Sequence, residues 1–137
     1  KNIGFCPTYT GIIDKWPSKR FKEDMLRKST NVLVLLPIRE LAKQVYAEFE
    51  VYGGPLNLTR CYLYRGAPYH SQETSLKMGV DIVIGTPGRN KDHIERGNLD
   101  FSSLKFRVLD EADEMLKMGF VYDVELILAK VKYVTKV

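Results

Sequence analysis

Three carboxylates stand within four residues in the segment Asp110-Glu111-Ala112-Asp113. The apolar run before them, residues 106–109, is typical of a buried strand. Open α/β sheets bind ligands just past the carboxyl ends of their strands, and an Asp there usually holds Mg²⁺ in NTPases with a phosphate-binding loop. We therefore expect Asp110 to hold Mg²⁺ through water, Glu111 to polarise the water that attacks a γ-phosphate, and Asp113 to report the nucleotide state. The alternative is a solvated acidic turn.

A second segment, Thr86-Pro87-Gly88-Arg89, follows the apolar run 81–84 after one glycine. Thr86 can cap the free amides of a helix, and Pro87 fits the first helical turn because its missing N–H costs nothing there. A helix start can bind a phosphate, Gly88 permits close backbone approach, and Arg89 adds a charged fork. The alternative is a plain helix cap with a surface arginine.

A third segment, Pro37-Ile38-Arg39-Glu40-Leu41-Ala42, follows the apolar run 32–36. Arg39 would stand in the first turn of a helix, where a positive charge opposes the helix dipole unless an anion offsets it. Arg39 is therefore a candidate phosphate contact. Ile38 cannot cap this helix as a Thr or Ser would.

Strands and helices that alternate along the chain must position these segments. Four apolar runs predict buried strands, and because they do not alternate with polar residues they predict a parallel α/β sheet covered on both faces. Apolar residues at helical spacing predict two amphipathic helices, and two weaker helices are expected between glycine stops. If the strands are parallel, all three segments emerge on one edge. The strand runs are 32–36, 60–64, 81–84 and 106–109; the stripes are Leu41, Val45, Phe49, Tyr52 and Phe120, Val124, Ile127, Leu128, Val131; the weaker helices are 69–78 and 87–96.

The composition of the 137-residue chain indicates one soluble globular domain. Its net charge of +4 mildly favours a polyanionic partner, although an ordinary basic domain explains the charge equally well. Cys6 and Cys61 form neither a metal-ligand pattern nor a disulfide framework, which favours a reducing, intracellular setting. The longest strongly apolar run, 32–36, is too short to span a bilayer, so no membrane partner is expected.

Together the three segments resemble the DEAD-box family of ATP-dependent RNA helicases. Asp110-Glu111-Ala112-Asp113 matches the family's namesake motif, Pro37 to Ala42 is similar to its Pro-Thr-Arg-Glu-Leu-Ala motif, and Thr86 to Arg89 matches its Thr-Pro-Gly-Arg motif. Order and spacing agree over about residues 31–137, whereas residues 1–30 match poorly and look irregular. The surroundings of these motifs, 91–96 and 115–120, are most similar to the plant nucleolar branch related to nucleolar helicase II.

The resemblance implies an α/β fold of the RecA-like type, a three-layer sandwich around a mostly parallel central sheet. Residues 1–137 would form one partial RecA-like domain, the first of the two in a helicase. ATP and Mg²⁺ would be the cofactors, and a nuclear or nucleolar location is implied, with the cytoplasm as an alternative. Asp110 and Glu111 would serve Mg²⁺ and water activation, and Asp113 would couple to other motifs. RNA would be held by its sugar–phosphate backbone without sequence preference, by Pro37, Ile38, Arg39, Arg65, Gly66, Thr86, Pro87, Gly88 and Arg89.

The sequence departs from the family pattern at several positions. Ile38 replaces a threonine, and Asn90 replaces an apolar helix residue, which weakens local packing. Arg65 replaces a glycine, where its bulk could block a close backbone approach or its charge could add a contact. The sequence contains no Gly-Lys pair, so it has no phosphate-binding loop of the Gly-x-x-x-x-Gly-Lys-Ser/Thr type. The second RecA-like domain is absent from it as well.

Three functions remain open at this point. The chain could be part of a helicase that hydrolyses ATP and separates RNA duplexes, and it would be inactive alone. It could instead be a weak RNA-binding module. A response-regulator-like α/β protein would also carry acids at a strand end, but the Thr86–Arg89 segment has no role there.

Overall fold

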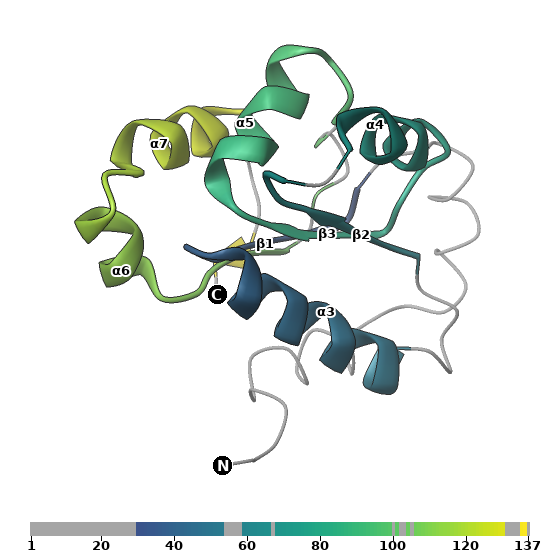
Figure 1. Ribbon diagram of the computed structural model, residues 1–137, viewed down its shortest axis with the longest axis horizontal. Coiled ribbons are helices and arrows are strands. Elements are labelled where there is room, and N and C mark those ends of the chain that lie inside the picture. The colour runs from purple at the N-terminus through teal and green to yellow at the C-terminus, as the bar shows by residue number, and fades with distance from the viewer. Residues whose placement is uncertain are drawn as a thin grey trace.

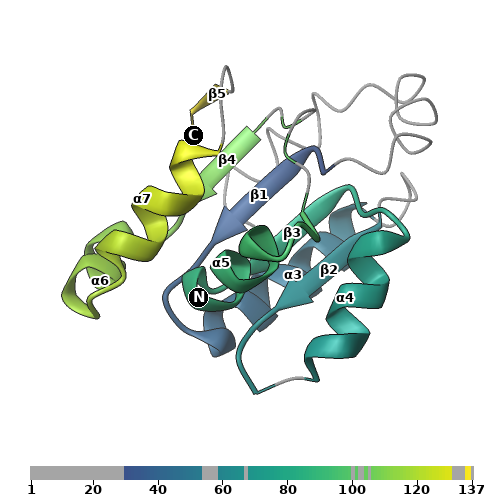
Figure 2. The same cartoon turned by 90° about the horizontal axis from the view of Figure 1, so that it is seen from above.

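The computed structural model describes residues 30–53, 59–66, 68–99, 101, 104, 106–130 and 135–136. Within these ranges the chain forms a five-stranded sheet in the order β2-β3-β1-β4-β5, and every neighbouring pair of strands is parallel. Figure 2 shows the strands side by side and running the same way. Residues 1–29 of the predicted irregular segment 1–30 lie outside the described residues.

The four longer strands occupy the apolar runs found in the sequence. They are β1 (Val32–Leu35), β2 (Arg60–Leu63), β3 (Ile82–Gly85) and β4 (Phe106–Leu109), and the two-residue β5 (Thr135–Lys136) follows. The central strands β1 and β3 are buried at every residue, as expected of strands covered on both faces. In the register of the sheet Val34 lies opposite Ile84 on one side and Val108 on the other.

Helices cover both faces of the sheet and make three layers (Figure 1). The long helix α3 (Arg39–Gly53) lies on one face. On the other face lie α4 (Tyr69–Lys77), α5 (Pro87–Glu95) and α7 (Val121–Ala129), while the short α6 (Ala112–Lys117) leads from β4 into α7. The described helices include none that is long and apolar enough to cross a membrane.

Two apolar cores fill the spaces between these layers. In the first core, Val45 and Phe49 of α3 pack against residues of β1, β3 and β4, with Leu41 partly buried beside them. The second core joins the opposite side of the sheet to α4, α6 and α7 through residues such as Leu76, Met115 and Ile127. Alternate residues of β1 enter different cores, because successive side chains of a strand point to opposite faces.

The predicted elements are confirmed to within one residue at nearly every boundary. The two weaker helices form and stop where predicted, since Gly79 and Gly97 follow them with φ of 92° and 75°, a backbone conformation that glycine adopts without strain. The predicted stripes face the cores: Val45 and Phe49 of α3 and Ile127 of α7 are buried, while Leu41, Phe120 and Val124 pack beside them partly buried. Val131 and the Tyr52 side chain lie outside the described residues.

Candidate functional site

The carboxyl edge of the sheet brings together all the segments singled out in the sequence. Three backbone hydrogen bonds link the end of one strand to the chain that leaves the neighbouring strand. Thr86 N donates to Leu63 O at 3.0 Å, Leu36 N to Gly85 O at 2.9 Å, and Asp110 N to Leu35 O at 3.0 Å. The segments therefore follow the strand order along this edge. The order is Arg65-Gly66, then 86–89, then 37–42, then 110–113.

Arg39, Arg65 and two glycines form the basic part of this edge. Arg39 lies at the start of α3, and its Nη1 would stand 3.1 Å from a Cβ built on Gly66. The side chain of Arg65 covers Gly88, where a built Cβ would stand 2.7 Å from Nε of Arg65. Nη2 of Arg65 also pairs with Oδ2 of Asp92 at 3.5 Å, while 66% of the arginine side chain stays exposed. The added charge of Arg65 thus faces solvent, and its bulk covers the backbone at Gly88.

Arg89 follows Gly88 on α5, and its side chain is turned toward α4. Its Nη1 donates to Oε1 of Gln72 at 3.0 Å, and its guanidinium lies 5.5 Å from the ring centroid of Tyr69. The amide of Gln72 donates in turn to the carbonyls of Tyr62 and Tyr64 at 3.4 and 3.2 Å. One buried glutamine therefore ties Arg89 to the chain at and just past the end of β2.

His93 completes this polar network and is fully buried. Nδ2 of Asn98 lies 3.2 Å from its Nδ1, and Oε1 of Gln72 lies 3.2 Å from its Nε2. Because the asparagine amide is a donor and the glutamine oxygen an acceptor, this arrangement fits a neutral ring with its proton on Nε2. Burial is the main cause that lowers the pKa of His93 to about 4, and the positive charge of Arg89 adds to it.

The capping role expected of Thr86 was wrong, although the helix begins where predicted. Its side chain makes no capping hydrogen bond. Pro87, as predicted, occupies the first turn and has no amide hydrogen to offer. The carbonyl of Thr86 serves this turn instead, since it accepts hydrogen bonds from the backbone N of Asn90 at 3.2 Å and from its Nδ2 at 2.9 Å. Asn90 is fully buried and its Oδ1 finds no hydrogen-bond partner among the described atoms, which is unusual for a buried polar group.

The acidic segment lies beyond β4 at the other end of the edge. Asp110 is half-buried in the turn after the strand, whereas Glu111 and Asp113 are exposed. Glu111 has φ 58° and ψ 45°, and it alone among the described non-glycine residues has a positive φ. Such left-handed backbone costs about 1–2 kcal/mol for a residue with a Cβ. Backbone strain of this kind clusters at functional sites, which makes Glu111 a candidate functional residue.

The chemistry of the acidic segment fits Mg²⁺. This ion prefers oxygen ligands, keeps several waters and is often bound through one or two carboxylates together with substrate phosphates. Asp110 and Glu111 offer two neighbouring carboxylates at a strand end, a ligand set of that size. No larger cluster of potential metal ligands occurs in the described part of the chain.

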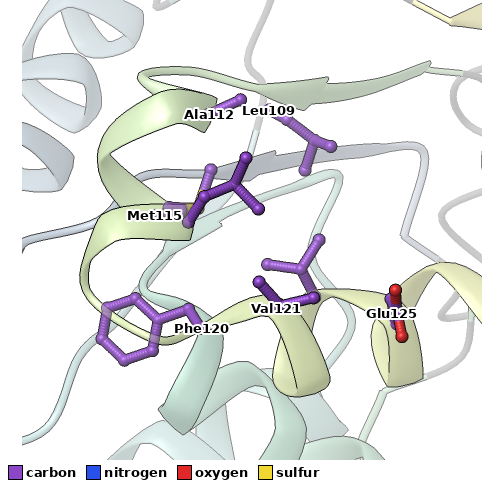
Figure 3. A pocket seen from close by; sticks show the side chains of 8 residues that line it. Leu109, Ala112, Met115, Phe120, Val121 and Glu125 are labelled. Atoms are coloured by element: carbon purple, nitrogen blue, oxygen red, sulfur yellow. The ribbon is translucent and has the colours of Figure 1, made fainter.

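An apolar hollow of about 160 Å³ lies beside the acidic segment, between α6 and α7 (Figure 3). Leu109 of β4, Met115 of α6 and Val121 of α7 line it, together with Ala112, Leu116, Phe120, Val124 and Glu125. The hollow offers a polar ligand almost nothing to bind. It is therefore a packing feature of α6 and α7 rather than part of the candidate site.

Sequence reasoning missed the residues that hold the basic side chains in place. Gln72 and His93 belong to no recognisable sequence motif, because a buried polar network is defined by contacts between elements. The three tyrosines beside Arg39, which are Tyr46, Tyr62 and Tyr64, were missed as well. A signal did exist for two of them, since Tyr62 and Tyr64 are two residues apart on an extended chain and so share a face.

Comparisons with known proteins agree with this geometry. The family model described as "DEAD/DEAH box helicase" matches residues 11–137. The match starts at residue 11, well before residue 31, where the resemblance of the motifs was expected to begin. A "DEAD box protein" of known structure from the hyperthermophile Methanococcus jannaschii has a TM-score of 0.77 and 39% identity, covering 91% of this chain and 33% of its own.

Curated relatives give the same picture. The "DEAD-box ATP-dependent RNA helicase 7" of Arabidopsis thaliana is 66% identical over this entire chain, which spans 20% of that protein. Its namesake from Spinacia oleracea is 69% identical over 107 residues, 78% of this chain and 16% of its own length. The "ATP-dependent RNA helicase DeaD" of Mycobacterium tuberculosis is 50% identical over 93% of this chain and 23% of its own length.

The chain therefore spans about a fifth of the length of the curated relatives that it matches. The sheet is that of an α/β RecA-like fold, and the family's motif segments lie side by side at its carboxyl edge. With the family match over residues 11–137, these findings show that the chain belongs to the DEAD/DEAH box helicase family.

Proposed function

We propose that this chain is part of the core of an ATP-dependent RNA helicase and that its carboxyl edge binds an RNA strand and an ATP–Mg²⁺ complex side by side. The hydrogen-bonded order of the segments along this edge carries the proposal. That order puts Arg39, Arg65 and Arg89 on the side of β1, β3 and β2, and the acids on the side of β4.

The RNA strand would lie along the basic part of the edge. Arg39 and Arg65, whose side chains are 58% and 66% exposed, would contact its phosphates. Ile38 and Gly66 are exposed and would supply surface for the strand. Pro37, Thr86, Pro87 and Gly88 are buried and would shape the edge beneath it, and Arg89 would contribute from its place against Gln72. Contacts of this kind read the backbone and carry no sequence information.

Asp110, Glu111 and Asp113 would serve the nucleotide. Mg²⁺, when bound, neutralises charge on the β- and γ-phosphates. Asp110 would hold it through water, and Glu111 would orient and deprotonate the attacking water. Asp113, in the first turn of α6, would transmit the state of the nucleotide to neighbouring elements.

RNA binding is tested by fluorescence anisotropy with a short single-stranded oligonucleotide at several salt concentrations. Arg39→Ala and Arg65→Ala should each weaken binding and reduce the slope of log affinity against log salt by about 0.7. Lys130→Ala is the matched control, since it removes the same charge at the C-terminus of α7 and should leave the slope unchanged. Binding that ignores both salt and these arginines would rule the RNA site out.

The isolated chain should not hydrolyse ATP. Its sequence has no Gly-Lys pair with which to hold the β- and γ-phosphates. A weak RNA-binding module without ATPase activity is therefore the second candidate, favoured because the basic part of the edge is built within the described residues. We expect no RNA-stimulated phosphate release above background. Turnover by this chain that Glu111→Gln abolishes would contradict the expectation.

The domain organisation and cellular location are proposed on the same basis. Residues 1–137 would form one partial RecA-like domain, so limited proteolysis should leave a single resistant core. A second RecA-like domain would belong to the parent helicase, as in the family. The resemblance of residues 91–96 and 115–120 to the plant nucleolar branch supports a nuclear or nucleolar location. A fluorescent fusion of the parent protein that stays in the cytoplasm would refute it.

A further inference from the structure

Three tyrosines form a continuous aromatic cluster next to the basic part of the edge. Tyr46 belongs to α3, whereas Tyr62 and Tyr64 lie on the same side of β2 and the residue after it. The rings of Tyr46 and Tyr62 are stacked with centroids 5.7 Å apart, and those of Tyr62 and Tyr64 are 4.3 Å apart. All three are half-buried, so part of each side chain remains accessible.

Two contacts hold the cluster in place, one at its middle ring and one at Tyr46. The hydroxyl of Tyr62 donates a hydrogen bond to the backbone carbonyl of Arg39, which ties the middle ring to the first turn of α3. The guanidinium of Arg60 lies 5.0 Å from the ring centroid of Tyr46 and pairs with Glu50 at 3.8 Å. The rings are thus ordered before any ligand arrives, which reduces the entropy lost on binding.

An open groove of about 510 Å³ runs over these rings, and we call it the tyrosine groove. Its volume lies within the range of about 300–1,000 Å³ typical of small-ligand sites. The groove is lined by Arg39, Glu40, Lys43, Tyr46, Tyr62 and Tyr64. Glu40 pairs with Arg39 at 3.2 Å and their charges cancel, so Lys43 gives the groove lining a net positive charge.

Arg39 connects the tyrosine groove to the proposed path of the RNA backbone. It lines the groove on one side and lies against Gly66 on the other. Tyr64 directly precedes Arg65 in the chain. A nucleotide whose phosphate reached Arg39 would therefore lie at the mouth of the tyrosine groove.

We propose that the tyrosine groove takes an unpaired base of the bound RNA strand. The inference rests on the proposed RNA-binding function and adds a base contact to it. Stacking on aromatic rings suits this ligand because every base has a π-face, so the contact strengthens binding without selecting a sequence. Lys43 and Arg39 suit the phosphates on either side of the base.

The test compares a short oligouridylate with an abasic strand of the same length and charge, by fluorescence anisotropy with the full 137-residue chain. The unaltered chain should bind the oligouridylate at least about fivefold more tightly, as expected for one stacked base. Tyr64→Leu should abolish this preference and leave the affinity for the abasic strand unchanged. Tyr64→Phe, which keeps the ring, should retain it.

Tyr122→Leu is the matched control, because Tyr122 is 68% exposed on α7 and lies outside the tyrosine groove. Equal affinity of the unaltered chain for the two strands would overturn the inference without reference to any variant. So would free uridine monophosphate that binds as tightly as the oligouridylate, since the groove would then serve a free nucleotide. Suppose the unaltered chain bound both strands equally while Arg39→Ala still weakened binding to the abasic strand. The proposed RNA-binding function would then stand, and only the base contact would be refuted.

Discussion

The guanidinium of Arg65 lies against the backbone of Gly88, where a Cβ would stand 2.7 Å from Nε and 3.2 Å from Nη2. Two segments that lie more than twenty residues apart are thereby joined at the carboxyl edge of the sheet. The contact relies on the absence of a side chain at position 88. It places the charge of Arg65 where the family's glycine has none.

Gly88→Ala should displace Arg65 without unfolding the domain. The atoms in the way belong to the far end of a flexible side chain, so they can move at little cost. Alanine also favours the helical state by about 1 kcal/mol over glycine, and position 88 lies in α5. We expect an unchanged or higher melting temperature and an RNA affinity as low as that of Arg65→Ala. A double variant that binds more weakly than either single variant would contradict this coupling.

Gly85→Ala should have the opposite character and destabilise the fold. A Cβ there would stand 2.1 Å from the backbone carbonyl of Leu63, which accepts a hydrogen bond from Thr86. A strand backbone cannot move aside as an arginine can, so the free energy of unfolding should fall by about 3 kcal/mol. Urea denaturation measures the loss, with Gly88→Ala as the comparison. A loss below about 0.5 kcal/mol, the range of neutral surface changes, would show that the strands can separate.

Gln72→Leu should lower both stability and RNA affinity. Leucine fills similar space but leaves the carbonyls of Tyr62 and Tyr64 without their donor, and a buried unpaired polar group costs about 1–3 kcal/mol. Arg89 would lose its acceptor at the same time. Gln44→Leu on the exposed side of α3 is the control and should change stability by less than about 0.5 kcal/mol. Equal effects of the two substitutions would refute the role given to Gln72.

His93 should make the domain sensitive to mild acid. Its pKa is about 4 in the folded chain against 6.5 for the ordinary group, so between these values the unfolded chain binds more protons. Its contribution is fully present above about pH 6.5 and is lost as the pH falls toward 4, by about 1.4 kcal/mol for each unit of pKa difference. Chemical denaturation across this range should give a steeper loss for the unaltered chain than for His93→Gln. Parallel pH profiles would show that the ring titrates normally.

Glu111→Gly should be more stable than Glu111→Ala by about 1 kcal/mol. Glycine adopts a φ of 58° without strain, whereas alanine keeps the cost of a Cβ in this conformation. The position is exposed, so neither variant loses buried contacts. Urea denaturation of the pair isolates the backbone effect. If alanine were equally stable, the strain assigned to position 111 would be absent.

The sequence alone sufficed for the four longer strands and for the edge that carries the motifs, whereas the two-residue β5 and the short helix α6 were not predicted. Strands buried on both faces are continuous apolar runs, and helices between them require parallel connections, so Val32–Leu35 and Ile82–Gly85 could be placed from pattern alone. Because the strands are parallel, their carboxyl ends meet at one edge of the sheet.

The internal support of the site could not be predicted in the same way. Thr86 was assigned its usual capping role, but in the structure its carbonyl serves the helix and Asn90 takes up the contact. The turn of Arg89 toward Gln72 depends on how α4 packs against α5. The contact of Arg89 with Gln72 is set by tertiary distance, about which spacing along the chain says nothing.

The separation of charge along the carboxyl edge has a consequence for the order of events. In the proposed function the RNA strand would lie beside Arg39, Arg65 and Arg89, and the ATP–Mg²⁺ complex beside Asp110 and Glu111, so two polyanions would have separate places on the rim. Neither would then have to leave before the other arrives.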